Sequence, residues 1–146
     1  MLAEINSLLD DLVSEDLSLV PAECMGEDQI ALQRICSRVQ AEGLRRLRRF
    51  DRGEGYANTM ALTAKAWLRW KCNLTYTAAT AQVEVARQLE SLPQTSQAFA
   101  AGDFSYRHAS MIARTAEKLG DKMEANAEDI LVTAARELDP DRFRSV

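Results

Sequence analysis

The residue types best suited to catalysis are few and scattered. A nucleophilic Ser or Cys needs a base, and His108 is the only histidine in the chain. It follows Ser105, which we predict to cap a helix, by three residues, so its expected role is local hydrogen bonding in the first helical turn. Cys24, Cys36 and Cys72 form no CxxC pair, the spacing typical of many zinc sites. We therefore expect no catalytic residue, no metal site and no cofactor in this segment.

Other catalytic signals are also missing. The sequence contains no GxxxxGK[ST], GxGxxG or HExxH motif, so phosphate-loop, dinucleotide and metalloprotease chemistry find no support. Five carboxylates recur between residues 117 and 129, and we expect them to form a solvated helical face. They are Glu117, Asp121, Glu124, Glu128 and Asp129.

The stronger signal is the distribution of charge. The formal net charge is -4, but residues 1–33 contain eight acidic residues and no Lys or Arg, whereas residues 34–71 contain ten basic residues and only three acidic ones. At about 100° per residue, five arginines fall within about 60° on one side of a predicted helix. They are Arg34, Arg38, Arg45, Arg49 and Arg52. This arginine stripe suits a polyanion surface, although the acidic segment could equally fold back and neutralise it.

A second candidate is a hairpin that resembles a helix-turn-helix. It comprises a helix over 64–71, a turn from Cys72 to Thr75 and a second helix over about 76–92, which could lie in a major groove. The possible base contacts on the second helix are Thr77, Thr80 and Arg87. Nearby acidic residues would oppose DNA phosphates, and hairpins of this outline are also frequent in plain helical bundles.

The elements that must position these residues are helical. Ala and Leu account for 39 of the 146 residues, whereas Gly and Pro account for nine. Apolar spacing predicts helices over 2–13, 28–50, 64–71, 76–92, 94–101, 106–119 and 121–138, and Asp139-Pro140 begins another. The expected fold is all-α: one domain over residues 1–146, a bundle of about six to seven helices, with residues 1–27 forming an acidic arm.

The apolar stripes also predict which side chains are buried. In the helix over 28–50 the inward residues would be Leu32, Cys36, Val39, Gly43, Leu47 and Phe50, opposite the arginines. In the helix over 121–138 they would be Ile130, Leu131 and Ala134.

The sequence also bears on location and context. No apolar run approaches the roughly 18 residues of a membrane span, and the acidic start is unlike a signal peptide. With no disulfide pattern, we expect a cytoplasmic protein without a membrane partner. The helix start at Asp139-Pro140 lies close to Val146, so we expect the chain to be the N-terminal part of a longer protein.

Several ordered motifs carry a family resemblance. They are AWL at 66–68, NLT at 73–75, a run ending in Leu92-Pro93, AAGDFSYRHASMIA at 100–113 and ARELDPDRFR at 135–144. Together with the basic helix before them, over residues 28–146, they resemble the domain of unknown function 222 of 13E12 repeat proteins. That resemblance implies a helical region ahead of an HNH nuclease module, which would supply metal-dependent DNA cleavage. None of that module is present, so no catalytic residue is carried over.

The hairpin, read with the FSYRHA motif, also resembles the DNA-binding part of ParB-type proteins, which implies a DNA role by analogy alone. The chain departs from its family at Ala78, Ala79, Thr80, Ala81 and Gln82, where members often have arginines. Its basic surface must therefore come from the arginine stripe.

These observations predict a noncatalytic helical module that binds or positions DNA, in an HNH-nuclease-type or mobile-element-associated protein. The predicted phosphate contacts are Arg38, Arg45, Arg49, Arg52, Lys65, Arg69 and Lys71. The alternative is a protein-interaction or assembly bundle, in which the same arginines dock against the acidic arm or a partner's acidic face. An HNH module downstream would make the parent protein an enzyme, and the sequence does not indicate an oligomeric state.

Overall fold

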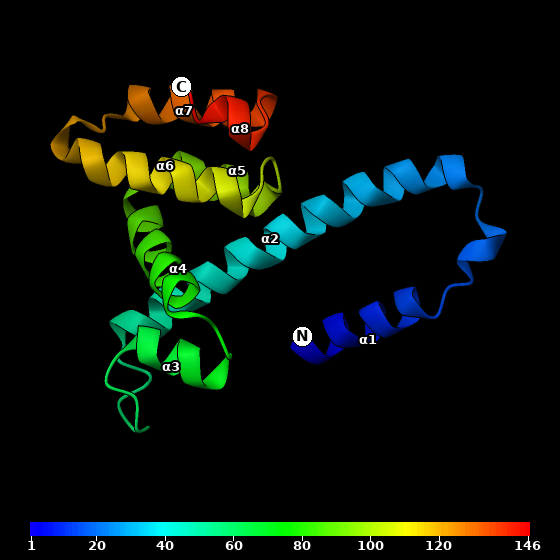
Figure 1. The fold of residues 1–146 in the computed structure, drawn as a ribbon, viewed down its shortest axis with the longest axis horizontal. Helices are drawn as coiled ribbons and strands as arrows, with labels where there is room; N and C mark the ends of the chain where they lie inside the picture. The colour runs from blue at the N-terminus through cyan, green and yellow to red at the C-terminus, as the bar shows by residue number, and fades with distance from the viewer. The chain divides into compact units, whose positions relative to one another are not determined.

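The computed structural model describes the backbone of residues 1–146 and every side chain except that of Ala125. Within this description there is no strand, which confirms the predicted all-α class. The α-helices are α1 (Leu2–Val13), α2 (Met25–Arg52), α3 (Ala64–Lys71), α4 (Tyr76–Gln88), α5 (Pro93–Ala101), α6 (Tyr106–Leu119), α7 (Ala125–Glu137) and α8 (Pro140–Phe143) (Figure 1). Short 3-10 turns join several of them.

The chain divides into two compact units, Met1–Leu32 and Gln33–Val146. The first unit contains α1, which spans the predicted residues 2–13, and the start of α2. None of the residues of α1 is buried. Its apolar stripe is exposed and consists of Leu2, Ile5, Leu8, Leu9 and Leu12.

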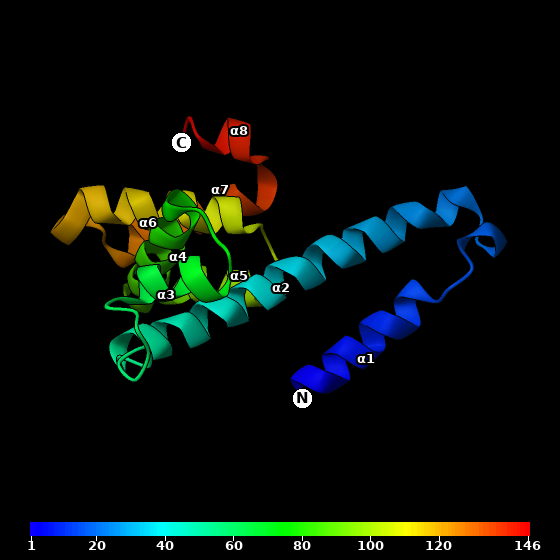
Figure 2. The ribbon, with the colours of Figure 1, turned by 60° about the horizontal axis from the view of Figure 1, so that its bottom comes forward.

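The second unit is built around α4, α5 and α6. α4 packs against α3 and α6, while α7 contacts α5 and α6 and α8 contacts α6 and α7 (Figure 2). Val83, Phe99 and Ile112 are completely buried where these helices meet. The apolar pattern predicts the inward residues of these three helices, and all of them are buried: Ala79, Val83, Ala86 and Leu89 along and just after α4, Ala98 and Phe99 of α5, and Ala109, Ile112, Ala113 and Ala116 of α6.

Two threonines begin the helices of the hairpin. Thr63 Oγ1 accepts the Ala66 N–H at 3.1 Å, and Thr75 Oγ1 accepts the Ala78 N–H at 3.1 Å. Each hydroxyl thus satisfies a backbone donor that the first helical turn leaves without a partner. In the turn between them, Asn73 has φ of 53°, a left-handed conformation that asparagine tolerates better than most residues.

α2 packs through a face that only partly overlaps the one predicted. Its buried residues are Ser37, Leu44 and Leu47, of which only Leu47 was predicted. Phe50, also predicted, packs partly buried against the core, whereas the predicted residues Cys36, Val39 and Gly43 are exposed. The centre of the packed face lies about 90° around the helix from the centre of that stripe, and Leu47 belongs to both. The arginine stripe therefore borders the packed face and does not lie opposite it.

The packed face of α2 is determined by contacts with residues that are distant in the sequence. Leu44 and Leu47 join Leu68 of α3 in the hydrophobic core. Near the other end, Gly102 has φ of 80°, and a Cβ at that position would come within 2.9 Å of the Arg34 carbonyl oxygen. Glycine is needed there for both its conformation and its close approach to α2. Neither contact is encoded in the periodicity of α2 itself.

α7 also differs from its prediction. It begins at Ala125, because Gly120–Lys122 form a 3-10 turn, and its buried face includes Glu128, Val132 and Ala135. Ile130, which was expected inside, is 55% exposed. Apolar spacing could not reveal this face because one of its inward residues is a carboxylate.

Candidate nucleic-acid interface

The arginine stripe lies along the exposed side of α2. Arg34, Arg38, Arg45, Arg49 and Arg52 are all exposed, as predicted from their spacing. At 1.5 Å per residue, the stripe extends about 27 Å along the helix axis. One rigid element therefore presents five guanidinium groups, which can form bidentate hydrogen bonds to phosphate oxygens.

Glu42 neutralises the middle of the stripe. Its carboxylate accepts hydrogen bonds from Arg45 Nε and Nη2 at 2.7 and 2.8 Å and from Arg46 Nε at 2.7 Å. Hydrogen bonds lower the pKa of Glu42 to about 2, and the hydrogen bonding from Arg45 contributes more to this shift than that from Arg46. The acid therefore stays ionised at neutral pH and holds two arginines on the helix surface.

Other predicted phosphate contacts are also paired. Arg52 Nη1 lies 2.9 Å from Glu90 Oε1, and Lys65 Nζ lies 3.5 Å from Glu84 Oε1. Exposed pairs of this kind contribute little to stability, at most about 1 kcal/mol, so a phosphate can compete for the cation. In contrast, Arg34, Arg38 and Arg49 make no ion pair with any described side chain.

The remaining predicted cations, Arg69 and Lys71, lie against aromatic rings. The Arg69 guanidinium carbon is 5.6 Å from the centre of the Tyr76 ring, and Lys71 Nζ is 3.7 Å from the centre of the Trp70 ring. Both rings belong to side chains that are more than half exposed. These cation–π contacts were not predicted from the sequence, although the positions of the aromatic residues close to cations are a recognisable signal for them.

The three predicted base-contacting residues do not form one reading surface. Thr77 is exposed, but Thr80 Oγ1 is buried without a hydrogen-bond partner among the described residues. Arg87 donates to Asp51 through Nε at 2.7 Å and Nη2 at 3.1 Å, and this hydrogen bonding raises its pKa. α4 is a central core helix, so only part of its surface is available to a partner.

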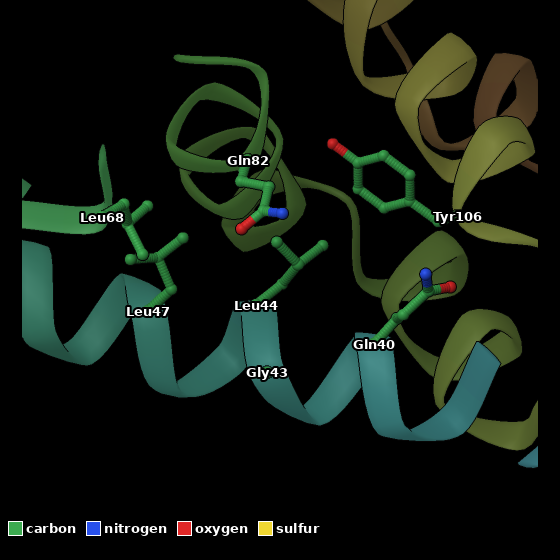
Figure 3. A pocket seen from close by; sticks show the side chains of 7 residues that line it. All are labelled: Gln40, Gly43, Leu44, Leu47, Leu68, Gln82 and Tyr106. Atoms are coloured by element: carbon green, nitrogen blue, oxygen red, sulfur yellow. The ribbon is translucent and has the colours of Figure 1, made fainter. Parts of the chain in front are cut away.

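A hollow of about 220 Å³ lies beside α2, with Gln40, Gln82 and Tyr106 as its polar lining residues (Figure 3). The other lining residues are Gly43, Leu44, Leu47 and Leu68. No carboxylate, histidine or cysteine lines it, so the hollow offers no acid–base pair. Burial raises the pKa of Tyr106 above its ordinary value.

His108 has the local role expected from the sequence, together with one long-range contact. Its Nδ1 lies 3.0 Å from Ser105 Oγ, and its Nε2 lies 2.8 Å from the Leu138 carbonyl oxygen. Because a carbonyl only accepts, Nε2 carries the proton. Ser105 thus bonds to His108 and gives no side-chain cap to the backbone of α6.

Two further observations concern the described residues only. No group of three or more His, Cys, Asp or Glu side chains among them could hold a metal ion. None of their helices combines the length and apolar character needed to cross a membrane.

The fold and this surface together define an all-helical protein whose most distinctive feature is an arginine-lined helix. Residues 28–146 match the family described as "Domain of unknown function (DUF222)", and the chain belongs to this family. The family resemblance found in the sequence is therefore confirmed over the predicted range. No curated protein and no solved structure matches the chain.

Proposed function

We propose that this chain is a noncatalytic module that binds DNA through the phosphate backbone. The observation that carries the proposal is the arginine stripe, in which Arg34, Arg38 and Arg49 have no ion-pair partner among the described side chains. Its length of about 27 Å corresponds to roughly eight base pairs of DNA. A straight, positively charged helix edge of this length suits nonspecific contact with a duplex.

The ion pairs set the number of contacts that we expect. The three unpaired arginines would give a slope of about -2.7 in a plot of log affinity against log salt concentration. Arg45 and Arg52 can exchange their exposed carboxylate partners for phosphates, which would raise the number of contacts to five and the slope to about -4.5. The proposal therefore predicts a slope between these two values.

Base reading has a minor role in this proposal. Thr77 is the only predicted base-contacting residue whose side chain is exposed and not engaged in an ion pair. We therefore propose that the module binds with little sequence preference and holds DNA for another part of its polypeptide. The HNH nuclease implied by the family resemblance is one candidate for that part.

The experiment is fluorescence anisotropy of a labelled random duplex, titrated with the full chain at several salt concentrations. Binding that weakens with a slope between about -2.7 and -4.5 would support the phosphate-contact mechanism. Binding whose affinity does not depend on salt, or an absence of binding even at low salt, would refute it. In the second case the chain would be reassigned to the alternative class, a protein-interaction bundle, which the exposed apolar stripe of α1 favours.

A further inference from the structure

The corner between α3 and α4 carries two large aromatic side chains on the surface (Figure 1). Trp70, near the end of α3, is 54% exposed, and Tyr76, the first residue of α4, is 63% exposed. Tryptophan is usually well buried in folded proteins, so this exposure needs an explanation. Neither ring packs against the hydrophobic core, whereas the neighbouring Trp67 and Leu74 do. The fold therefore does not use these two rings.

Each of the two rings is accompanied by a cation that has no carboxylate partner. Arg69 lies over the Tyr76 ring and Lys71 lies over the Trp70 ring, at 5.6 and 3.7 Å from the ring centres. No described carboxylate pairs with either cation. Residues 55–83 contain no Asp or Glu, so the sequence on both sides of the corner is positive. The corner thus combines exposed aromatic rings with positive charge that is not neutralised.

The corner is held in place by local hydrogen bonds and by the core. The Cys72 N–H donates to the Leu68 carbonyl oxygen at 3.0 Å where α3 ends, and Thr75 caps the start of α4. Asn73, with its left-handed backbone, makes the turn between the two helices. Leu68 and Ala79 are buried, so both helices are fixed in the core within one turn or less of the rings. A site on such elements is better ordered than one on a loop.

We propose that this corner binds single-stranded DNA. Unpaired bases would stack on Trp70 and Tyr76, while Arg69 and Lys71 contact the phosphates between those bases. Stacking on an aromatic ring tolerates any base, because every base has a flat π-face. The inference extends the proposed function from duplex to single-stranded DNA. It depends on residues outside the arginine stripe, so either proposal can fail without the other.

The chemistry of the corner favours this ligand over others that bind aromatic rings. A cationic ligand such as a trimethylammonium group would meet Arg69 and Lys71, which already lie against the rings. A duplex keeps the faces of its bases inside the stack, so it could meet the cations but not the rings. An anionic lipid surface offers charge without a flat partner for the rings. A strand with unpaired bases offers both a flat face and an anion.

The fluorescence of Trp70 tests the stacking directly. The chain has two tryptophans, so Trp67→Phe leaves Trp70 as the one that emits. A short oligothymidylate is expected to quench this emission, whereas an abasic oligonucleotide of the same length, which has the same phosphates and no bases, should not. Equal quenching by both strands, or binding of oligothymidylate without quenching, would overturn the proposal. Quenching by phosphatidylserine vesicles but not by oligothymidylate would also overturn it and assign the corner to a membrane surface.

Binding measurements on the chain with both tryptophans give a second test. In anisotropy titrations with labelled oligothymidylate, Trp70→Ala should weaken binding by at least about fivefold, and Trp70→Phe, which keeps a ring, should weaken it less. Ile130→Ala is the matched control, because this apolar side chain of α7 is 55% exposed. The affinity of Trp70→Ala for a random duplex should stay near that of the wild type. An unchanged affinity for the single strand, or an equal loss for single strand and duplex, would overturn the proposal.

The dependence on salt tests the two cations. Arg69→Gln combined with Lys71→Gln should make the salt slope for oligothymidylate shallower by about 1.4, because each phosphate contact with a single strand contributes about 0.7. Lys118→Gln with Lys122→Gln removes the same charge from exposed positions on another part of the unit and should leave the slope unchanged. Equal slopes for all of these proteins would overturn the phosphate contacts. Binding of duplex but not of oligothymidylate by the wild type would overturn this inference and leave the arginine stripe as the DNA contact.

Discussion

The buried carboxylate of Glu128 gives the sharpest prediction about the fold. Leu92, the residue before α5, makes no side-chain cap, so the first backbone N–H groups of the helix need acceptors from elsewhere. Glu128 Oε1, from α7, accepts the Thr95 N–H at 2.7 Å and the Thr95 hydroxyl at 2.9 Å. Both residues are buried, with 4% and 0% exposure. A side chain from a distant helix thus replaces the missing local cap.

The cost of removing this carboxylate follows from the two hydrogen bonds. Glu128→Ala leaves two buried donors without the acceptor, at about 1–3 kcal/mol each, so we expect a loss of about 4 kcal/mol. Glu128→Gln keeps a side-chain oxygen that can accept both bonds and loses only the charge, so we expect a loss of about 1 kcal/mol. Total stability is on the order of 5–15 kcal/mol, and the alanine variant would lose a large part of it.

Urea denaturation followed by circular dichroism measures these losses. A double-mutant cycle with Thr95→Val isolates the hydroxyl contact, and we expect the two substitutions together to cost less than the sum of the single ones. A Glu128→Ala variant within about 1 kcal/mol of the wild type would refute the reasoning, because the carboxylate would then not hold α5. Equal losses for the Ala and Gln variants would also refute it.

Three further predictions concern a structural histidine, the stripe and pH. His108→Ala should lower the free energy of unfolding by about 2–4 kcal/mol, measured in urea, because it removes two hydrogen bonds and buried ring contacts. Glu42→Gln releases Arg45, so the salt slope of DNA binding should steepen by about 0.9, whereas Glu117→Gln, with the same change in charge, should leave the slope unchanged. Folding stability should fall as pH rises above about 10. Tyr106 ionises at its ordinary pKa in the unfolded chain but only at a higher pH in the folded chain, where its pKa is raised, so ionisation favours the unfolded state. In urea titrations at pH 9 and 11, Tyr106→Phe should reduce that fall, and an unchanged fall would contradict this assignment.

Much of the fold could be predicted from local patterns. Capping threonines, Pro93 at a helix start and Gly102 with φ of 80° are short-range signals, and each marks a helix boundary found in the structure. The inward faces of α4 and α6 were predictable because their neighbours surround them, so every apolar residue at the right spacing is buried.

The packing of α2 and α7 was not predictable in the same way. Along α2 the side chain of Val39 is exposed while that of Ser37 is buried, so apolar character does not mark the packed face. In α7 the inward position is held by Glu128, whose partner Thr95 lies 33 residues earlier in the chain. Periodicity describes one helix at a time and contains no information about such partners.

In the candidate site, too, features set by local helix geometry were predictable and features set by tertiary contacts were not. The arginine spacing along α2 correctly predicted an exposed stripe, because the spacing depends only on helical geometry. The ion pair between Arg87 and Asp51 joins residues 36 positions apart, so the sequence did not reveal that this predicted base contact is engaged. The burial of the Thr80 hydroxyl also depends on tertiary packing.

The most direct test of the central claim compares three proteins in one DNA-binding assay at low salt. They are the wild type, a variant with Arg34→Gln, Arg38→Gln and Arg49→Gln, and a control with Arg114→Gln, Lys118→Gln and Lys122→Gln, which removes the same charge from exposed positions outside α2. Our account predicts that the first variant loses most of its affinity for a random duplex while the control stays near the wild type, with circular dichroism showing all three folded. Equal loss in both variants would contradict the account, because binding would then follow total charge and not the arginine stripe.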